Sequence, residues 1–354
     1  MLNSATIVAH CRIGFETECA SDLESVAAQA RMPLAIDARR DRAMVTAVGV
    51  DDVRCWNSAL AATPPQFARS LFAGSGPHVL SSRDRIGPLI ALVADLRPPF
   101  QSVWLETADT NEGKTHSGLC RRLAPLFEAE LASRKMLVRG AADRPRLHVL
   151  FETAERAWVG TSEAPTGSAW PMGIPRLTMP GAAPSRSTLK LAEAFVTFLD
   201  EQERVRAFVP GMRAVDLGAA PGGWTWQLIQ RGLAVVAVDN GPLQASIAGD
   251  PLVEHLRVDG LTYRPRRAVD WMVCDMVLQP SRIATLVAGW LADGACRRTI
   301  FNLKLPMKKR YAEVQRCQTI IGETLDARRV RHTLRFRQLY HDREEITGYC
   351  ARSG

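Results

Sequence analysis

The sequence predicts two domains, an α+β region followed by an α/β domain built on a parallel sheet. Three observations predict this organisation. The chain has 354 residues, more than one hydrophobic core usually serves. In its second half, short apolar runs alternate with helical stretches, as in parallel strands joined by crossover helices. Between the halves lies a proline-rich segment that breaks regular structure.

The first half, residues 1–160, mixes strand and helix patterns. Residues 5–13 alternate like a strand, and residues 16–30 have helical spacing. Residues 117–135 predict a helix whose apolar stripe holds Leu119, Leu123, Leu126, Phe127 and Leu131. Two β-rich runs, residues 147–151 and 156–160, follow on either side of a turn. We expect an α+β module here.

Residues 161–184 are expected to link the domains. Five prolines interrupt the segment: Pro165, Pro171, Pro175, Pro180 and Pro184. Arg176 and Arg186 allow it to follow a nucleic-acid backbone, and a solvated linker is an equal alternative.

The second domain, residues 185–354, has the rhythm of a parallel sheet. Its expected strands are residues 213–217, 234–238, 255–258, 271–274 and 299–303. The end departs from this rhythm, because residues 330–339 and 345–349 alternate like the two strands of an antiparallel hairpin.

Charge and cysteine content narrow the function class. The formal net charge of +8 favours polyanionic partners. The eight cysteines form no C-x-x-C pair, which argues against a zinc site or a disulfide framework, so no metal is expected. The N-terminus does not have the pattern of a secretion signal, and no apolar run is long enough to span a bilayer. We expect a soluble protein of a reducing cytoplasm, without a membrane partner.

A glycine-rich turn is the strongest local signal. The strand at residues 213–217 runs into Gly218, Gly222 and Gly223 and then into a helix at residues 224–230. Glycines permit close backbone approach to a ligand, and Asp216 can accept from a ligand's amino group. A dinucleotide turn requires G-x-G-x-x-G, whereas this turn has Ala220 and Pro221, and Pro221 offers no N–H to a phosphate. A ligand without phosphate fits better.

Two acids follow the next two strands. Asp239 is placed to accept from both hydroxyls of a ribose, and Asp259 from an adenine amino group. Capping or turn formation is the alternative for each.

The motifs together resemble a known family. Residues 216–224, DLGAAPGGW, resemble the cofactor turn of FtsJ-like RNA 2′-O-methyltransferases. The segments SRSTLKL (185–191), VDNGPL (238–243), WMVCDM (271–276) and FNLKLPMKKR (301–310) resemble those of the bacterial 23S ribosomal RNA cytidine 2′-O-ribose methyltransferases, the RlmM family. The resemblance is close over residues 185–345 and looser before them. It implies a Rossmann-like S-adenosylmethionine-dependent methyltransferase domain, a THUMP-like, ferredoxin-like RNA-binding region before it, and a cytidine in the peptidyl-transferase region of 23S RNA as target.

The resemblance also implies site residues. The family's cofactor contacts correspond to Ser187, Ala220, Pro221, Gly222, Gly223, Asp239, Asp259 and Asp275. Its catalytic Lys-Asp-Lys-Glu set corresponds to Lys190, Asp275, Lys304 and Glu345, with Lys304 as the base. Glu344 lies beside Glu345, and adjacent strand residues face opposite sides of a sheet.

The chemistry itself requires a base. A ribose hydroxyl is a poor nucleophile, so a positioned group must take its proton during in-line attack on the methyl group. A lysine serves when its pKa is lowered by burial or by another cation, and we expect Lys190 to lower the pKa of Lys304. Asp275 would orient the amine, although its charge opposes that shift.

Three alternatives remain at this point. Amino-group methylation usually needs an Asn/Asp-Pro-Pro-aromatic turn, which the run from Cys274 to Pro280 does not have. Methylation at carbon 5 needs a nucleophilic thiol, but Cys274 should face the sheet side opposite to Asp275 and be buried. A non-catalytic RNA-binding or assembly factor can keep the same fold.

Two basic clusters are expected beside the active edge of the sheet. They are residues 307–310, MKKR, and residues 328–332, RRVRH. Both are candidates for contacts with RNA phosphates, and a solvated face is the usual alternative.

Overall fold

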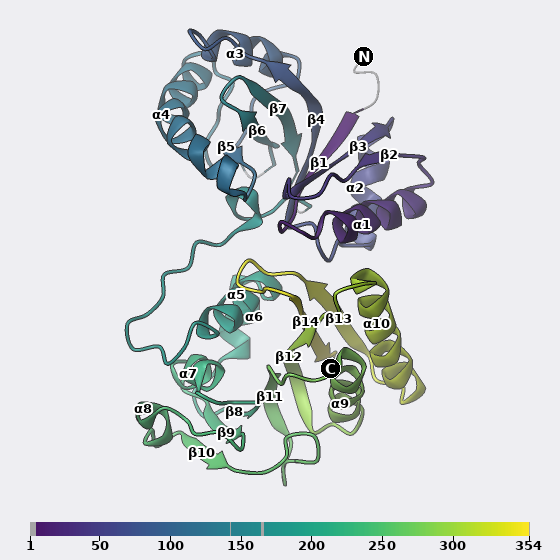
Figure 1. Cartoon of the computed structure of the whole chain (residues 1–354), viewed down its shortest axis with the longest axis vertical. Helices are drawn as coiled ribbons and strands as arrows, with labels where there is room; N and C mark the ends of the chain where they lie inside the picture. The colour runs from purple at the N-terminus through teal and green to yellow at the C-terminus, as the bar shows by residue number, and fades with distance from the viewer. Residues whose placement is uncertain (1–4, 142, 164–165, 354) are drawn as a thin grey trace. The chain divides into compact units, whose positions relative to one another are not determined.

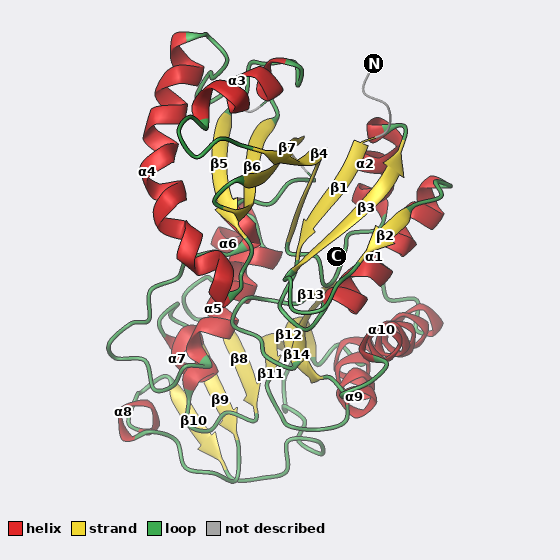
Figure 2. Ribbon diagram, turned by 45° about the horizontal axis from the view of Figure 1, so that its top comes forward, coloured by secondary structure: helices red, strands yellow, loops and turns green. Residues whose placement is uncertain are grey.

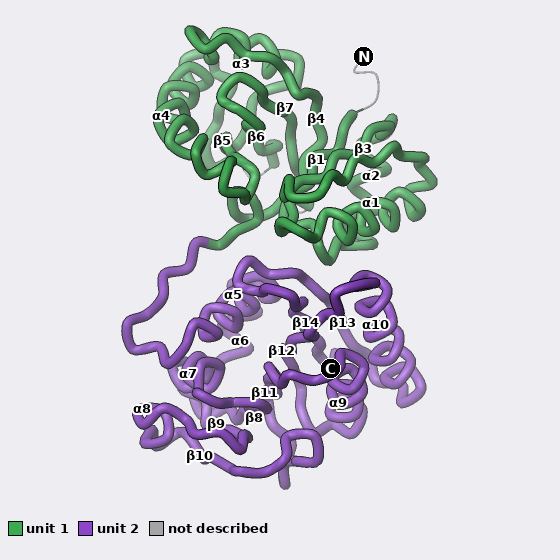
Figure 3. The backbone as a smooth tube through the Cα atoms, viewed as in Figure 1, with its two compact units in different colours: residues 1–175 green, residues 176–354 purple. Residues whose placement is uncertain are grey.

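The computed structural model describes residues 5–141, 143–163 and 166–353, which form two compact units (Figure 3). Unit 1 comprises residues 1–175 and unit 2 residues 176–354, so the boundary lies inside the proline-rich segment. Each unit is built on its own seven-stranded sheet.

The sheet of unit 1 is mixed and has the strand order β2-β3-β1-β4-β7-β6-β5. All its neighbouring strands are antiparallel except β5 and β6, which run parallel. In chain order the elements are β1 (Ala5–His10), α1 (Glu16–Ala30), β2 (Ala35–Asp37), β3 (Met44–Val50), α2 (Val53–Ala62), β4 (Ser70–Val79), α3 (Ile86–Ala94), β5 (Ser102–Thr107), α4 (Asn111–Ser133), β6 (Arg146–Thr153) and β7 (Arg156–Ser162).

Helices cover both ends of this sheet. Figure 1 shows α1 and α2 beside β1–β3, and α3 and α4 beside β5–β7. Leu123, Phe127 and Leu131 of α4 are buried against Val149 and Phe151 of β6, as the predicted stripe requires. Leu126 is 59% exposed, so its place in that stripe is wrong. The helix also begins earlier than predicted, because Thr110 caps it by accepting from the Gly113 N–H at 2.9 Å.

The end of unit 1 is held by specific contacts. The Met172 N–H, in a short 3-10 helix at Pro171–Gly173, donates to the buried carboxylate of Glu106. Arg146 donates to the Ser168 carbonyl at 2.6 Å. The first part of the expected linker is therefore packed on unit 1, and β7 extends to Ser162 within it.

The sheet of unit 2 has the order β10-β9-β8-β11-β12-β14-β13. The first five of these strands are parallel, and β14 pairs antiparallel with both β12 and β13. The strands are β8 (Arg213–Leu217), β9 (Ala234–Val238), β10 (Val253–Leu256), β11 (Val269–Cys274), β12 (Cys296–Lys304), β13 (His332–Arg337) and β14 (Glu345–Arg352). Strand order reverses between β8 and β11, where open α/β sheets bind ligands.

Helices lie on both faces of this sheet (Figures 1 and 2). They are α5 (Thr188–Phe198), α6 (Glu201–Ala207), α7 (Gly223–Ile229), α8 (Ala245–Ala248), α9 (Pro280–Ala292) and α10 (Arg310–Ala327). Leu191 and Phe195 of α5 and Leu228 of α7 share a buried core with Trp271 and Val273 of β11. The Rossmann-like architecture and the terminal hairpin predicted from the sequence are confirmed.

No helix among residues 5–141, 143–163 and 166–353 is long and apolar enough to cross a membrane.

Candidate active site

The carboxyl ends of the parallel strands in unit 2 meet at one edge. Leu217, which ends β8, is level with Val238 of β9 and with Cys274 of β11, while Val238 is level with Leu256 of β10. The side chains that follow these residues therefore gather along the same edge, which we call the active edge.

The glycine turn over this edge depends on conformations that favour glycine. Gly222 caps α7 with φ 112°, and a Cβ there would lie 3.0 Å from Ile247. Gly218 has φ 81°, and a Cβ there would lie 2.8 Å from the Met276 side chain. Both positions are left-handed and closely packed, so a side chain is strained there.

Asp216 lies beneath this turn with an unsatisfied oxygen. Its side chain is fully buried, and Oδ2 accepts from the Thr225 hydroxyl at 2.7 Å. Oδ1 has no hydrogen-bond partner among the residues that the structure describes. Burial raises the pKa of Asp216 to about 7, although the Thr225 hydrogen bond opposes the shift. Buried carboxylate oxygens normally accept a hydrogen bond, so Asp216 Oδ1 is available to accept one from a ligand.

Asp239 is held by two backbone amides. Its Oδ2 accepts from the Ala220 N–H at 3.0 Å, and its Oδ1 accepts from the Gly241 N–H at 2.7 Å. Each carboxylate oxygen can accept a further hydrogen bond. The contact with Ala220 brings Asp239 directly to the glycine turn.

Ser187 lies beside Gly223 at the start of α5. A Cβ on Gly223 would lie 2.5 Å from the hydroxyl oxygens of Ser185 and Ser187, which are 2.7 Å apart. Within residues 5–141, 143–163 and 166–353, the buried Thr188 hydroxyl next to them has no hydrogen-bond partner. Polar groups from residues 185–188 therefore meet the first turn of α7.

Asp259 forms a local turn. It is exposed, and its Oδ1 accepts from the Leu261 N–H at 2.9 Å. It lies three residues beyond β10, because that strand ends at Leu256 rather than at Val258 as predicted. Asp259 therefore forms a turn through one of its two oxygens, as the turn-forming alternative predicted.

The four residues of the predicted catalytic set come together at the active edge. The Lys304 Nζ is 2.6 Å from Asp275 Oδ1 and also donates to Glu345. Lys190, from α5, pairs with Glu345 and lies 3.6 Å from Asp275 Oδ2. Glu345 is level with Lys304 across the β12–β14 pair, whereas the exposed Glu344 pairs with Arg310. Two cations and two carboxylates alternate in one cluster.

The expected lowering of the Lys304 pKa is wrong. Desolvation does lower it, but the charges of Asp275 and Glu345 and their hydrogen bonds outweigh that effect, so the pKa of Lys304 is raised. Conversely, the charges of Lys304 and Lys190 outweigh burial and lower the pKa of Glu345. The cluster therefore favours the ammonium form of Lys304.

Sequence reasoning missed the residues behind this cluster. Asn302 donates to Asp275 Oδ1 at 3.0 Å, and Thr347 lies 2.8 Å from Asn302 Oδ1. Asp342 lies next to Thr347, and Glu193 of α5 accepts from the N–H groups of Tyr340 and His341. The sequence signal that could have found Asn302 and Thr347 was their spacing. Asn302 lies two residues before Lys304, and Thr347 lies two residues after Glu345.

The predicted burial of Cys274 is confirmed. Cys274 is fully buried, and burial raises the pKa of its thiol to about 12.

The predicted place of one basic cluster is wrong. Residues 328–332 do not lie at the active edge. His332 is paired with Arg352, near the amino end of β12, because β13 runs parallel to β12. Lys308 and Lys309 do follow β12 at the active edge and are exposed.

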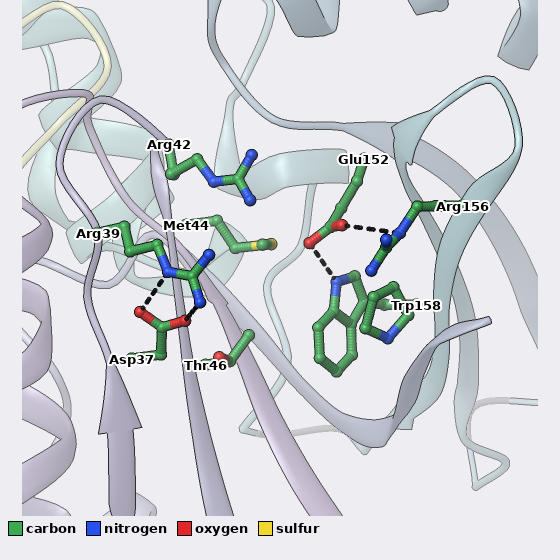
Figure 4. Close-up of a pocket in the computed structure, with 9 residues that line it drawn as sticks. Asp37, Arg39, Arg42, Met44, Thr46, Glu152, Arg156 and Trp158 are labelled. Carbon is green, nitrogen blue, oxygen red and sulfur yellow. Dashed lines mark hydrogen bonds and ion pairs between the residues drawn. The ribbon is translucent and has the colours of Figure 1, made fainter. Parts of the chain in front are cut away.

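Unit 1 has a polar pocket of its own, with a volume of about 220 Å³ (Figure 4). It is lined by Asp37, Arg39, Arg42, Met44, Thr46, Pro77, Glu152, Arg156 and Trp158. Arg39 pairs with Asp37 at 2.9 Å, and Glu152 accepts from the Trp158 indole N–H at 2.9 Å. Three guanidinium groups thus face two carboxylates and one aromatic ring, which favours an anionic ligand.

Comparison with known proteins identifies the family. The chain is 49% identical over 352 residues to the ribosomal RNA large subunit methyltransferase M of Methylococcus capsulatus, covering 99% of both chains. The chain belongs to the ribosomal RNA large subunit methyltransferase M family. Relatives of the same name include those of Aromatoleum aromaticum, 48% identical with 99% of this chain and 96% of the relative covered, and of Azoarcus sp., 47% identical with 97% and 95% covered.

Two family models divide the chain in the same way. The ribosomal RNA large subunit methyltransferase M N-terminal model matches residues 84–163, and the FtsJ-like methyltransferase model matches residues 183–288. Membership in the M family, expected from the motifs, is confirmed and extends over nearly the whole chain. Among the described residues, no cluster of histidine, cysteine, aspartate and glutamate is arranged to hold a metal ion.

Proposed function

We propose that this protein methylates the ribose 2′-hydroxyl of a cytidine in 23S ribosomal RNA, with S-adenosylmethionine as methyl donor and Lys304 as general base. The observation that carries the proposal is the Lys190, Asp275, Lys304 and Glu345 cluster at the active edge, beside the glycine turn. The names of the relatives support large-subunit ribosomal RNA as the substrate.

The residues at the glycine turn fit S-adenosylmethionine. The orphaned Asp216 Oδ1 and Thr188 hydroxyl can each take a polar group of the ligand. Asp239 would hold the ribose hydroxyls, with Ser187, Ala220, Pro221, Gly222, Gly223, Asp259 and Asp275 as the other proposed contacts. The cofactor supplies an electrophilic methyl group on a positively charged sulfur.

The lysine and its partners then carry the proton chemistry. Asp275 and Glu345 orient the Lys304 amine. Once the ammonium has lost its proton to solvent, the neutral amine takes the proton of the attacking hydroxyl. Lys190 neutralises one of the two carboxylates, so the cluster carries one excess negative charge rather than two while the Lys304 amine is neutral. Because the pKa of Lys304 is raised, this deprotonation limits the active fraction of the enzyme.

RNA binding is assigned to both units. In unit 1, the pocket with Arg39, Arg42 and Arg156 is a candidate for holding RNA phosphates, with Trp158 beside them. In unit 2, Lys308 and Lys309 follow the catalytic strand. Lysine and arginine contacts of this kind position RNA without reading its sequence.

The rival functions have less support. A fully buried Cys274 with a raised thiol pKa is a poor nucleophile for methylation at carbon 5. A non-catalytic RNA-binding factor would not need the complete four-residue cluster. Methyl transfer therefore separates the main proposal from this second one.

The test is Lys304→Ala, measured in single-turnover transfer of labelled methyl to 23S RNA lacking the modification. Loss of a general base typically lowers the rate by about 10²–10⁴-fold. Affinity for S-adenosylmethionine should stay nearly unchanged, because Lys304 is not among the proposed cofactor contacts. Lys114→Ala, which changes an exposed lysine of α4 with no proposed role in catalysis or RNA binding, is the matched control. A parent-like rate for Lys304→Ala would remove Lys304 as the base, and mapping of 2′-O-methyl groups checks the target.

A further inference from the structure

A buried chain of hydrogen bonds lies behind the catalytic cluster. Asn302 and Thr347 are level with each other across β12 and β14, two residues along each strand from the Lys304–Glu345 pair. The side chains of Asn302, Thr347 and Asp342 are all at most 1% exposed. From Asp342 the chain runs through Thr347 and Asn302 to Asp275, which contacts Lys304.

The direction of each hydrogen bond follows from the chemistry of the groups. Ionised Asp275 only accepts, so Asn302 must present its amide NH₂ to Asp275 Oδ1, at 3.0 Å. The Asn302 carbonyl then faces Thr347 and needs a donor. The Thr347 hydroxyl, 2.8 Å away, is the group that can supply one.

This assignment fixes the protonation of Asp342. A hydroxyl has one proton, and that of Thr347 is directed to Asn302. Toward Asp342, 3.1 Å from Oδ1 and 3.0 Å from Oδ2, Thr347 can therefore only accept. Asp342 Oδ2 already accepts from the Leu339 N–H at 2.9 Å, so Oδ1 is the oxygen that carries the proton.

We propose that Asp342 is a neutral carboxylic acid that donates to Thr347, and that it acts as a positioning residue for Lys304 through Thr347, Asn302 and Asp275. The inference rests on the proposed function, because it assigns Lys304 the role of base. Asp342 touches neither the amine nor the reacting atoms. Its effect is to orient the Asp275 carboxylate that holds the amine.

The surroundings of Asp342 favour its neutral form. Burial raises the pKa of Asp342 well above its usual range, and the negative charges of Glu345 and Glu193 raise it further. The Leu339 N–H and the Lys190 ammonium act in the opposite direction but are outweighed. The hydrogen-bond geometry and the electrostatics thus agree independently.

Three variants of the full-length protein test the chain. Thr347→Val removes the hydroxyl and leaves Asn302 without its donor, so the single-turnover rate should fall by roughly tenfold to a hundredfold, the loss expected from a misplaced catalytic group. The single-turnover rate of Asp342→Ala should fall by a similar factor. Asp342→Asn keeps a donor toward Thr347 and an acceptor for Leu339, so it should retain the parent rate. Affinity for RNA should stay unchanged in all three variants. Affinity for S-adenosylmethionine should fall severalfold at most, because only its proposed contact with Asp275 depends on these hydrogen bonds.

Two further readouts separate positioning from a merely structural role. Asp342→Asn should share the pH–rate profile of the parent, because a neutral acid and an amide carry the same charge. At pH 9, where Asp216, with its pKa of about 7, is ionised, the infrared band of a protonated carboxylic acid should be present in the parent and absent in Asp342→Asn. Cofactor affinity, measured alongside, shows whether each variant is folded.

The outcomes are distinguishable from failure of the proposed function. If Asp342→Asn is as slow as Asp342→Ala, or the infrared band is unaffected, Asp342 is not a neutral donor and the proposal is overturned. If Thr347→Val keeps the parent rate while Lys304→Ala is inactive, Lys304 remains the proposed base, and the hydrogen bonds from Asp342 through Thr347 and Asn302 do not act on it. If Lys304→Ala is itself active, the proposed base is wrong whatever Thr347→Val does.

Discussion

At the scale of single residues, the catalytic lysine differs most from expectation. Lys190 is in the same cluster as Lys304, as the motif implies, but the Lys304 amine contacts two carboxylates directly, those of Asp275 and Glu345. A motif gives the residue types in a site but not the distances that decide whose charge dominates. The sign of the pKa shift could therefore not be predicted from the sequence.

The raised pKa gives a pH prediction. Below the pKa, the neutral fraction of a lysine grows about tenfold per pH unit, and the ordinary lysine pKa is about 10.4. Since the pKa of Lys304 lies above its ordinary value, the transfer rate should rise with pH throughout the neutral and mildly alkaline range without levelling off. Single-turnover rates at saturating cofactor check this, because saturation removes any effect of Asp216 on binding. A plateau below about pH 9 would contradict a raised pKa, given the ordinary value of about 10.4.

A second residue-scale prediction concerns Asp239. Asp239→Ala removes the acceptor for the Ala220 and Gly241 amides and for the ligand's ribose. Charge-assisted hydrogen bonds of this kind contribute about 1.5–3 kcal/mol. Affinity for S-adenosylmethionine, measured by calorimetry, should fall by roughly tenfold or more. Asp250→Ala is the matched control, because Asp250 also accepts from a backbone amide in a turn, the Leu252 N–H. Equal affinities for the two variants would exclude Asp239 from the site.

At the scale of elements, periodicity predicted the strands of the parallel sheet well and those of the sheet in unit 1 poorly. Strands β8 and β9 have the predicted bounds, because buried parallel strands are short apolar runs. Strand β4 was not predicted, since its Gly74, Gly76 and Pro77 resemble a turn. In the structure Gly74 is level with Gly160 of β7, and a Cβ on Gly74 would lie 2.6 Å from the Gly160 Cα. These glycines permit close strand approach, which a single sequence does not reveal.

The connection between β13 and β14 is also fixed by a residue distant in the sequence. Glu193 of α5 is buried and accepts from the Tyr340 N–H at 2.7 Å, the His341 N–H at 2.9 Å and the His341 Nδ1 at 2.6 Å. The same helix carries Lys190, so one element holds both the cluster and the loop that precedes Glu345. Neither contact follows from the hairpin pattern alone.

Glu193→Gln tests this role of α5. The amide NH₂ faces backbone donors, so at least one part-buried N–H loses its acceptor, at a cost of about 1–3 kcal/mol. We expect the amides of residues 338–344 to exchange with solvent roughly tenfold faster or more, since about 1.4 kcal/mol corresponds to a factor of ten. Hydrogen exchange followed by mass spectrometry measures it. The exposed Glu201→Gln at the start of α6 should leave these amides unchanged, and unaltered exchange in Glu193→Gln would rule out this role.

At the scale of the whole molecule, the net charge of +8 indicated an anionic partner but not where it binds. The proline-rich segment, residues 161–184, was expected to link two domains, and the boundary between the two compact units lies inside it, after residue 175. The pocket of unit 1 could not be predicted, because Arg39 and Arg42 are more than a hundred residues from Arg156 and meet it only through the strand order β3-β1-β4-β7. The sequence therefore assigned RNA binding to the first half without indicating which of its residues would carry it.

Removal of two cations from this pocket tests whether unit 1 binds RNA. In the variant Arg42→Ala/Arg156→Ala the pocket retains one of its three guanidinium groups, while Asp37 and Glu152 remain. For each phosphate that the protein no longer neutralises, the dependence of log affinity on log salt should weaken by about 0.7 for a single strand and about 0.9 for a duplex. RNA binding measured over a salt series should show a reduced slope and weaker affinity, with S-adenosylmethionine affinity unchanged because the glycine turn lies in unit 2. Arg134→Ala, which removes an exposed arginine that follows α4 and pairs with Glu130, is the control and should keep the parent slope. If both variants keep the parent slope, the pocket does not bind RNA phosphates. The cations that neutralise those phosphates must then lie on other surfaces, such as that of Lys308 and Lys309.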